Sequence, residues 1–128
     1  MKDFVPYNEA LELKELGFDE PCFGVFPDGS KLVKINGEPR NWNDNVINGE
    51  TTSAPTFSQA FRWFREKCDL IGVILPYLII GNQWYYKITN RNNSSGLPFE
   101  EGFETFEEAE LACLNKLIEI VKDEKKNS

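Results

Sequence analysis

Residues 56–68 read TFSQAFRWFREKC, and residues 69–89 continue as DLIGVILPYLIIGNQWYYKIT. In the first run the apolar side chains recur at the spacing of one helical face, which predicts an amphipathic helix from Thr56 to Cys68. In the second run, Leu70–Ile80 is apolar at odd and even positions and rich in Ile, which predicts a strand. Gly81-Asn82 then predicts a turn into a partner strand over Gln83–Thr89. The segment is therefore expected to form a helix followed by a β-hairpin.

This apolar strand has side chains to bury on both of its faces. Pro76 cannot donate a hydrogen bond to a neighbouring strand, so the strand is expected at a sheet edge, with a bulge, or broken at that residue. Ile71, Val73 and Leu75 share one face, and helices packed on the opposite face leave them uncovered. Two interpretations stay open: these side chains form a subunit or partner interface, or the segment Asn36–Ala54 covers them.

The N-terminal part predicts a helix and a second hairpin. Pro6 suits a first helical turn and Gly17 suits a left-handed cap, so a helix is expected over Pro6–Leu16. An Asp-Gly pair lies between two β-rich runs, Cys22–Phe26 and Lys31–Ile35. This pair favours the type I′ turn of a tight hairpin, so the two runs are expected to pair.

Two polar segments are expected to be loops. The composition from Asn36 to Ala54 shifts to Asn, Gly, Thr and Ser, which is typical of a loop, and Trp42 is expected to tuck against the body of the protein. The segment Asn90–Gly102 is likewise polar. A last helix is expected over Phe106–Lys122, because Thr105 followed three residues later by glutamate forms a capping box.

The expected order of elements is therefore α-β-β-α-β-β-α. This order predicts the α+β class, with an antiparallel four-stranded sheet and the helices packed mainly on one face. The length of 128 residues fits a single globular domain over residues 1–128, with a frayed C-terminal tail from residue 123.

The chain is acidic, with a formal net charge of −7. This is the wrong sign for a surface that neutralises phosphates, so direct binding to nucleic acid or to an anionic membrane is not expected. The first residues lack the apolar run of a signal peptide, and no apolar run is long enough to span a bilayer. Cys22, Cys68 and Cys113 are odd in number and widely spaced, which favours reduced, buried thiols and a cytoplasmic location.

Histidine is absent from all 128 residues. Since histidine is the usual general base and the commonest metal ligand, its absence excludes Ser-His-Asp and Cys-His hydrolysis and most zinc chemistry. The glycine patterns of nucleotide-binding loops and the aspartate spacing of a calcium loop do not occur either. We therefore expect a protein that is not an enzyme, with no catalytic residues, no cofactor and no metal ion.

Candidate interface residues come from the central helix and from the strand that follows it. Trp and Arg dominate the binding energy of many protein interfaces. Here the two arginines lie on the side of the helix away from its apolar stripe, and the tryptophan lies at the border between the two sides. The alternative interpretation is an ordinary solvated helix face whose tryptophan leans over a neighbour. The candidate interface consists of Arg62, Trp63, Arg65, Ile71, Val73 and Leu75.

Three stretches of the chain together carry a resemblance to a family of proteins. They are residues 5–7 (VPY) with 13–24 (LKELGFDEPCFG), residues 54–67 (APTFSQAFRWFREK), and residues 105–114 (TFEEAELACL) with 117–121 (LIEIV). With these stretches the chain resembles a family of small proteins from gut bacteria and their phages or prophages. The resemblance implies no reaction and transfers no binding residues. It implies a context, namely an accessory protein of a mobile element that acts inside a bacterial cell.

Two functional hypotheses follow. The first is a non-catalytic protein that works by contacting another protein, or a second copy of itself in a homodimer. The second is an acidic mimic of nucleic acid that occupies the binding site of a host DNA-binding or defence protein. A mimic needs carboxylates spread over one face at the spacing of phosphates, whereas an interaction module needs an exposed apolar patch.

Overall fold

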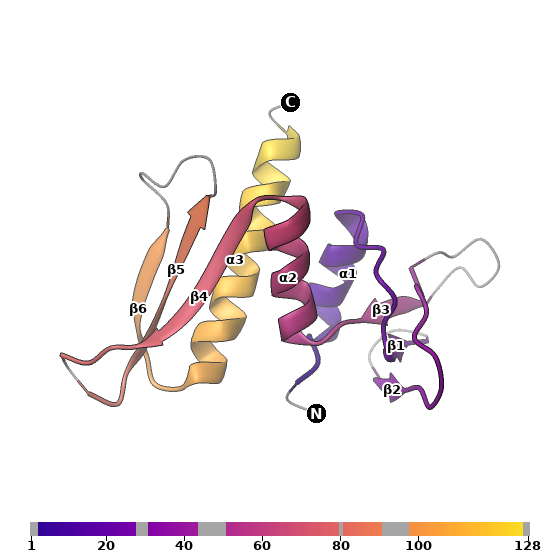
Figure 1. The fold of residues 1–128 in the computed structure, drawn as a ribbon, viewed down its shortest axis with the longest axis horizontal. Coiled ribbons are helices and arrows are strands. Elements are labelled where there is room, and N and C mark those ends of the chain that lie inside the picture. The colour runs from indigo at the N-terminus through magenta and orange to yellow at the C-terminus, as the bar shows by residue number, and fades with distance from the viewer. Residues whose placement is uncertain (1–2, 28–30, 44–50, 80, 91–97, 127–128) are drawn as a thin grey trace. The chain divides into compact units, whose positions relative to one another are not determined.

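The computed structural model describes residues 3–27, 31–43, 51–79, 81–90 and 98–126. Within these residues the chain forms three α-helices and two three-stranded antiparallel sheets, as Figure 1 shows. It divides into two compact units, Met1–Ala60 and Phe61–Ser128, and each unit has its own sheet. The α+β class expected from the sequence is therefore confirmed.

The first unit packs a helix on a small sheet. Helix α1 (Tyr7–Glu15) precedes strands β1 (Gly24–Phe26), β2 (Val33–Lys34) and β3 (Thr52–Ala54), which lie in the order β2-β1-β3. Tyr7 meets Phe26 edge to face, with 5.3 Å between the ring centroids. Apolar side chains from the helix, the sheet and the turns between them form the core of this unit: Val5, Ala10, Leu13, Leu16, Phe18, Val25 and Phe26 are buried.

Helix α1 ends where the sequence predicts. Gly17 has a φ of 99°, a backbone angle that favours glycine, and the N–H of Phe18 donates to the carbonyl of Leu13 at 3.0 Å. The predicted hairpin also forms, because Val25 of β1 pairs with Val33 of β2. The turn proposed for residues 27–30 falls largely outside the described residues. Trp42 tucks in as expected, since its indole N–H donates to the carbonyl of Cys22 at 3.2 Å.

The second unit holds the longer elements. Helix α2 (Phe57–Lys67) starts in the first unit and leads into strands β4 (Leu70–Pro76), β5 (Trp84–Asn90) and β6 (Phe99–Phe103), followed by helix α3 (Phe106–Lys126). The strands lie in the order β4-β5-β6, and every neighbouring pair is antiparallel. Pro76 is the last residue of β4, a sheet-edge strand, as its missing N–H predicts.

Helix α3 covers one side of this second sheet. A Cβ added to Gly72 would lie 2.8 Å from Cys113 Sγ and 3.3 Å from Leu117 Cδ1, so the even-numbered residues of β4 face α3. Trp84 of β5 lies on the same side, with its ring 5.4 Å from that of Phe106. The fully buried side chains here come from both layers: Leu70, Ile88, Cys113, Leu114 and Leu117. Since side chains alternate along a strand, the odd-numbered residues of β4 point away from α3.

The expectation of one four-stranded sheet is wrong. Each predicted hairpin instead gains a third strand of its own: β3 pairs with β1, and β6 pairs with β5. Both added strands lie at the ends of segments whose polar composition predicts loops, Asn36–Ala54 and Asn90–Gly102. Backbone pairing with an existing strand organises them, because residues such as Glu100, Glu101 and Gly102 have a low strand preference.

Several element boundaries also differ from the prediction: β1 and β2 are shorter than the runs Cys22–Phe26 and Lys31–Ile35, and β4 and α3 end elsewhere than expected. The strand expected over Leu70–Ile80 ends at Pro76, where the chain enters the turn and the Tyr77 N–H closes the hairpin by donating to the Gln83 carbonyl at 2.8 Å. The last helix continues past Lys122 to Lys126 and carries basic residues in its last turn, where they stabilise the negative end of the helix dipole. Its start agrees with the predicted cap, since the N–H of Glu108 donates to Thr105 Oγ1 at 3.0 Å.

Candidate functional site

The side of the second sheet that points away from α3 is the main candidate site, and we call it the outer face. Register places its side chains in cross-strand pairs: Ile71 with Thr89, Val73 with Lys87 and Leu75 with Tyr85 between β4 and β5. Between β5 and β6, Lys87 pairs with Phe99 and Tyr85 pairs with Glu101. Directly paired residues lie on the same face of an antiparallel sheet. The outer face therefore consists of Ile71, Val73, Leu75, Tyr85, Lys87, Thr89, Phe99 and Glu101.

Most of the outer face is apolar or aromatic. The Tyr85 ring lies 5.3 Å from the Phe99 ring and 5.8 Å from the Tyr77 ring, so three aromatic side chains form a continuous group. Phe99 is 56% exposed, and the aliphatic side chains of β4, on the other side of β5, are half-buried. An apolar group of this size on a strand surface is typical of a contact site.

The turn that leaves β4 extends this apolar surface. Leu78 is 87% exposed and Ile79 is 88% exposed. The backbone around them is ordered by two hydrogen bonds, from the Tyr77 N–H to the Gln83 carbonyl at 2.8 Å and from the Gly81 N–H to the Tyr77 carbonyl at 3.1 Å. These bonds hold two large aliphatic side chains out in the solvent, at the end of the sheet where Tyr77 meets Tyr85.

The charge of the outer face is balanced. It carries one cation, Lys87, and one carboxylate, Glu101, on neighbouring strands and two residues apart along the strand direction. The Glu101 carboxylate also raises the pKa of the nearby Tyr77 phenol, because a second negative charge beside it is unfavourable. The net charge of this face is therefore zero, whereas the whole chain has a net charge of −7.

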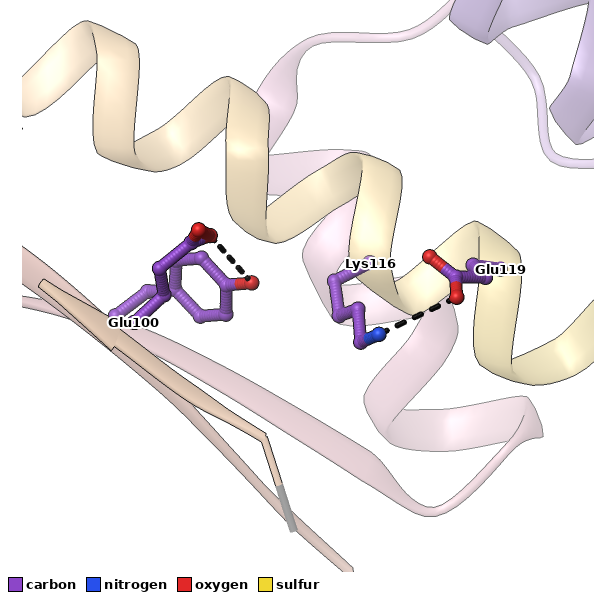
Figure 2. A network of polar contacts seen from close by, with 4 residues as sticks. Glu100, Lys116 and Glu119 are labelled. Atoms are coloured by element: carbon purple, nitrogen blue, oxygen red, sulfur yellow. Dashed lines mark hydrogen bonds and ion pairs between the residues drawn. The ribbon is translucent and has the colours of Figure 1, made fainter.

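A groove on the helix side of the same sheet is the second candidate. It has a volume of about 700 Å³ and lies between Tyr86 and Glu100 of the sheet and the middle of α3. Figure 2 shows its polar network: the Tyr86 hydroxyl donates to Glu100 Oε1 at 3.2 Å, and Lys116 Nζ lies 3.3 Å from Glu119 Oε1. Burial of the phenol and the Glu100 carboxylate raise the pKa of Tyr86, which keeps the phenol a proton donor.

This groove offers little for catalysis. The charged groups shown in Figure 2 are already partnered within the chain, and Tyr86 is held in its neutral form. A general base needs a pKa near the working pH, and a phenol whose pKa is raised does not provide one. The two pairs are better explained as local contacts, one between β5 and β6 and one within α3, that line the groove on either side.

The cysteines are held as thiols. Burial raises the pKa of Cys22 to about 12, and burial with the nearby Glu110 raises the pKa of Cys113 to about 12. Burial also raises the pKa of Cys68, which is half-buried. A nucleophilic cysteine requires a lowered pKa, so these environments favour inert structural thiols. Among the described residues, no group of three or more Cys, Asp or Glu side chains could hold a metal ion.

The interface residues predicted from the sequence do not all come together. Ile71, Val73 and Leu75 share the outer face as expected. Trp63 is only 5% exposed and packs edge to face against Phe64 at 5.1 Å, so its indole is part of the core. Arg62 and Arg65 are exposed on α2, but they lack the accessible tryptophan that the proposed hot spot needs.

Two residues of the outer face were missed because the strand β6 was missed. Phe99 and Glu101 join the face only through the pairing of β6 with β5. The alternation of Tyr85 and Lys87 in the sequence 83–89 could have placed them on one face, opposite Trp84 and Tyr86. The exposure of Leu78 and Ile79 has no signal in the sequence, since an apolar run of this kind usually becomes buried.

Comparison with known proteins assigns no family to this chain. No family model, curated protein or solved structure matches this chain. In the part of the chain that the structure describes, every helix is too short or too polar to cross a lipid bilayer.

Proposed function

We propose that this chain is a non-catalytic protein-binding module and that the outer face is its contact surface. The observation that carries the proposal is the aromatic and aliphatic group on the outer face, with Phe99 more than half exposed. The turn after β4, which follows Tyr77, exposes Leu78 and Ile79 as well. Burying one such side chain in a complex contributes about 1.5–3 kcal/mol. The apolar side chains of the outer face therefore supply a driving force for binding.

The alternative cover for this face, the segment Asn36–Ala54, has weaker support. Its described side chains and backbone groups bond within the first unit: Arg40 exchanges backbone hydrogen bonds with Cys22, and Asn43 Nδ2 donates to the Phe18 carbonyl at 2.9 Å. Its last residues form β3, which pairs with β1. These contacts favour a structural role for the segment in its own sheet.

The mimic hypothesis also has weaker support on this face. A mimic of nucleic acid needs a row of carboxylates. Among its residues the outer face carries a single carboxylate, that of Glu101, and it lies near Lys87. The glutamates at the start of α3 are explained by the positive end of the helix dipole. The resemblance of the sequence to proteins of gut bacteria and their phages is the support for proposing that this contact is made inside a bacterial cell.

Matched phenylalanine substitutions test the proposal. Phe99 and Phe23 are exposed to a similar extent, 56% and 51%, and they lie in different units. We expect Phe99→Ala to weaken the capture of a bound protein from nuclease-treated bacterial lysate and Phe23→Ala to leave it unchanged. Circular dichroism checks that both variants fold. Equal capture by wild type and Phe99→Ala contradicts the proposal, and a captured protein that added DNA displaces favours the mimic.

A further inference from the structure

The balanced charge of the outer face points to a specific occupant. We propose that the outer face binds the outer face of a second copy of this chain, in a two-fold symmetric, face-to-face dimer. This inference rests on the proposed function, because it names the partner of the same surface. The residues that set the pairing are Lys87 and Glu101, which belong to neighbouring strands.

The outer face is complementary to itself in charge. In a two-fold contact, if residue i of one copy meets residue j of the other, residue j of the first copy also meets residue i of the second. An axis that bisects the line between Lys87 and Glu101 brings each lysine opposite the glutamate of the other copy. One geometry thus forms two ion pairs at once, and it leaves no charge of this face facing a like charge.

The same axis brings the apolar side chains together. Phe99 and Tyr85 lie between the two charged positions, each paired directly with one of them, Phe99 with Lys87 and Tyr85 with Glu101. A contact centred there stacks the aromatic groups of the two copies on each other. Ile71, Val73 and Leu75 flank that centre along β4. An aromatic centre with charged positions beside it is the usual arrangement of a protein interface.

Charge also argues for a second copy over a strongly charged partner. The chain carries a net charge of −7, yet this face holds one positive and one negative side chain. A cationic protein or peptide would gain more from the glutamates around the start of α3 than from this face. Two acidic chains repel each other at a distance, and a neutral, apolar contact surface is the kind that keeps this repulsion low where they touch.

The area of the outer face sets the expected affinity of the dimer. Three strands of up to seven residues cover roughly 14 Å by 23 Å, which is about 320 Å² in outline. Stable interfaces bury about 800 Å² per partner, so the outline of the sheet alone is well below the area of a stable dimer. The exposed Leu78 and Ile79 add area at one end of the face. We therefore expect a reversible dimer at micromolar to millimolar concentration.

Charge reversal provides a sharp test. Purified full-length chain is studied by sedimentation velocity from micromolar to millimolar concentration. Lys87→Glu and Glu101→Lys each replace two attractions with two repulsions, and each variant alone is expected to dimerise about tenfold more weakly or worse. An equimolar mixture of the two variants is expected to recover the dimer, because every lysine again meets a glutamate. Lys67→Glu and Glu104→Lys, exposed positions off the outer face, are the matched controls and should dimerise as wild type does.

The outcomes separate this inference from the proposed function. A chain that stays monomeric at millimolar concentration overturns the second copy as occupant, and so does a dimer that ignores both charge reversals. The chain could be monomeric while Phe99→Ala still weakens its capture of another protein. In that case the proposed function stands with a different partner. If Phe99→Ala changes neither self-association nor capture, the outer face is not a contact surface and both ideas fail.

Discussion

At Gly72, β4 approaches α3 closely. An added Cβ would lie 2.8 Å from Cys113 Sγ and 3.3 Å from both Leu117 and Phe61. We predict that Gly72→Ala lowers the free energy of unfolding by about 1–3 kcal/mol, because overpacking forces neighbours to move. Urea unfolding followed by circular dichroism measures the loss.

A second substitution shows whether the sulfur is the obstacle. Cys113→Ala removes the Sγ atom nearest to the added methyl group. The double variant Gly72→Ala with Cys113→Ala should therefore lose less stability than the two single losses added together. Simple additivity of the two losses contradicts the packing that we describe at this contact.

The thiols give a pH-dependent prediction. Burial raises the pKa of Cys22 and Cys113 from 9.0 to about 12 in the folded chain. A group whose pKa is raised by folding stabilises the native state fully below pH 9, and this contribution is lost as the pH rises towards 12. We expect the free energy of unfolding to fall over that window. At pH 8, native Cys68 should react with a thiol reagent first, and equal rates for all three thiols would contradict this burial.

Single residues show where the sequence is informative. The φ of Gly17 and the cap at Thr105 follow from local rules that need only a few neighbouring residues, and both are present. The burial of Trp63 depends on packing with distant parts of the chain, so its position at the border of the helical stripe did not predict it. The pairing of Tyr86 with Glu100 depends in turn on the strand β6.

At the scale of elements, the segments with a strong sequence pattern were predictable, and the short polar segments without one were not. The apolar stripe of α2 and the capping box of α3 identify these helices to within one residue at their starts. Strands β3 and β6 have short, polar sequences, TSA and FEEGF, and form only because a partner strand with open hydrogen-bonding groups is available. Their absence from the prediction explains why two hairpins were expected to join in one sheet.

Strand β3 depends on one asparagine. Asn43 Oδ1 accepts a hydrogen bond from the N–H of Ser53 at 2.8 Å, and Ser53 is 1% exposed. We predict that Asn43→Ala destabilises the protein by about 1–3 kcal/mol, because a buried N–H loses its partner. Asn36→Ala, at an exposed position of the same segment, is the control and should change stability little. Equal, small effects of both substitutions in urea unfolding contradict this role.

At the scale of the whole chain, the sequence predicts a surface but not its extent. The aliphatic row of β4 was a candidate interface from the start, because a strand with two apolar faces needs cover on both. Its aromatic partner Phe99 and its charges Lys87 and Glu101 emerge only from the strand register. The function that we propose therefore rests on a face that three separate stretches of sequence assemble.

Site-specific photo-crosslinking tests this face most directly. Phe99 is replaced by benzoylphenylalanine in bacterial cells that express the full chain, and Phe23, exposed to a similar extent, is replaced in a control. Our account predicts a crosslinked protein adduct at Phe99 after illumination and none at Phe23, with twice the chain mass if the partner is a second copy. The same pattern at both positions, or no adduct at Phe99, would contradict the outer face as the contact surface.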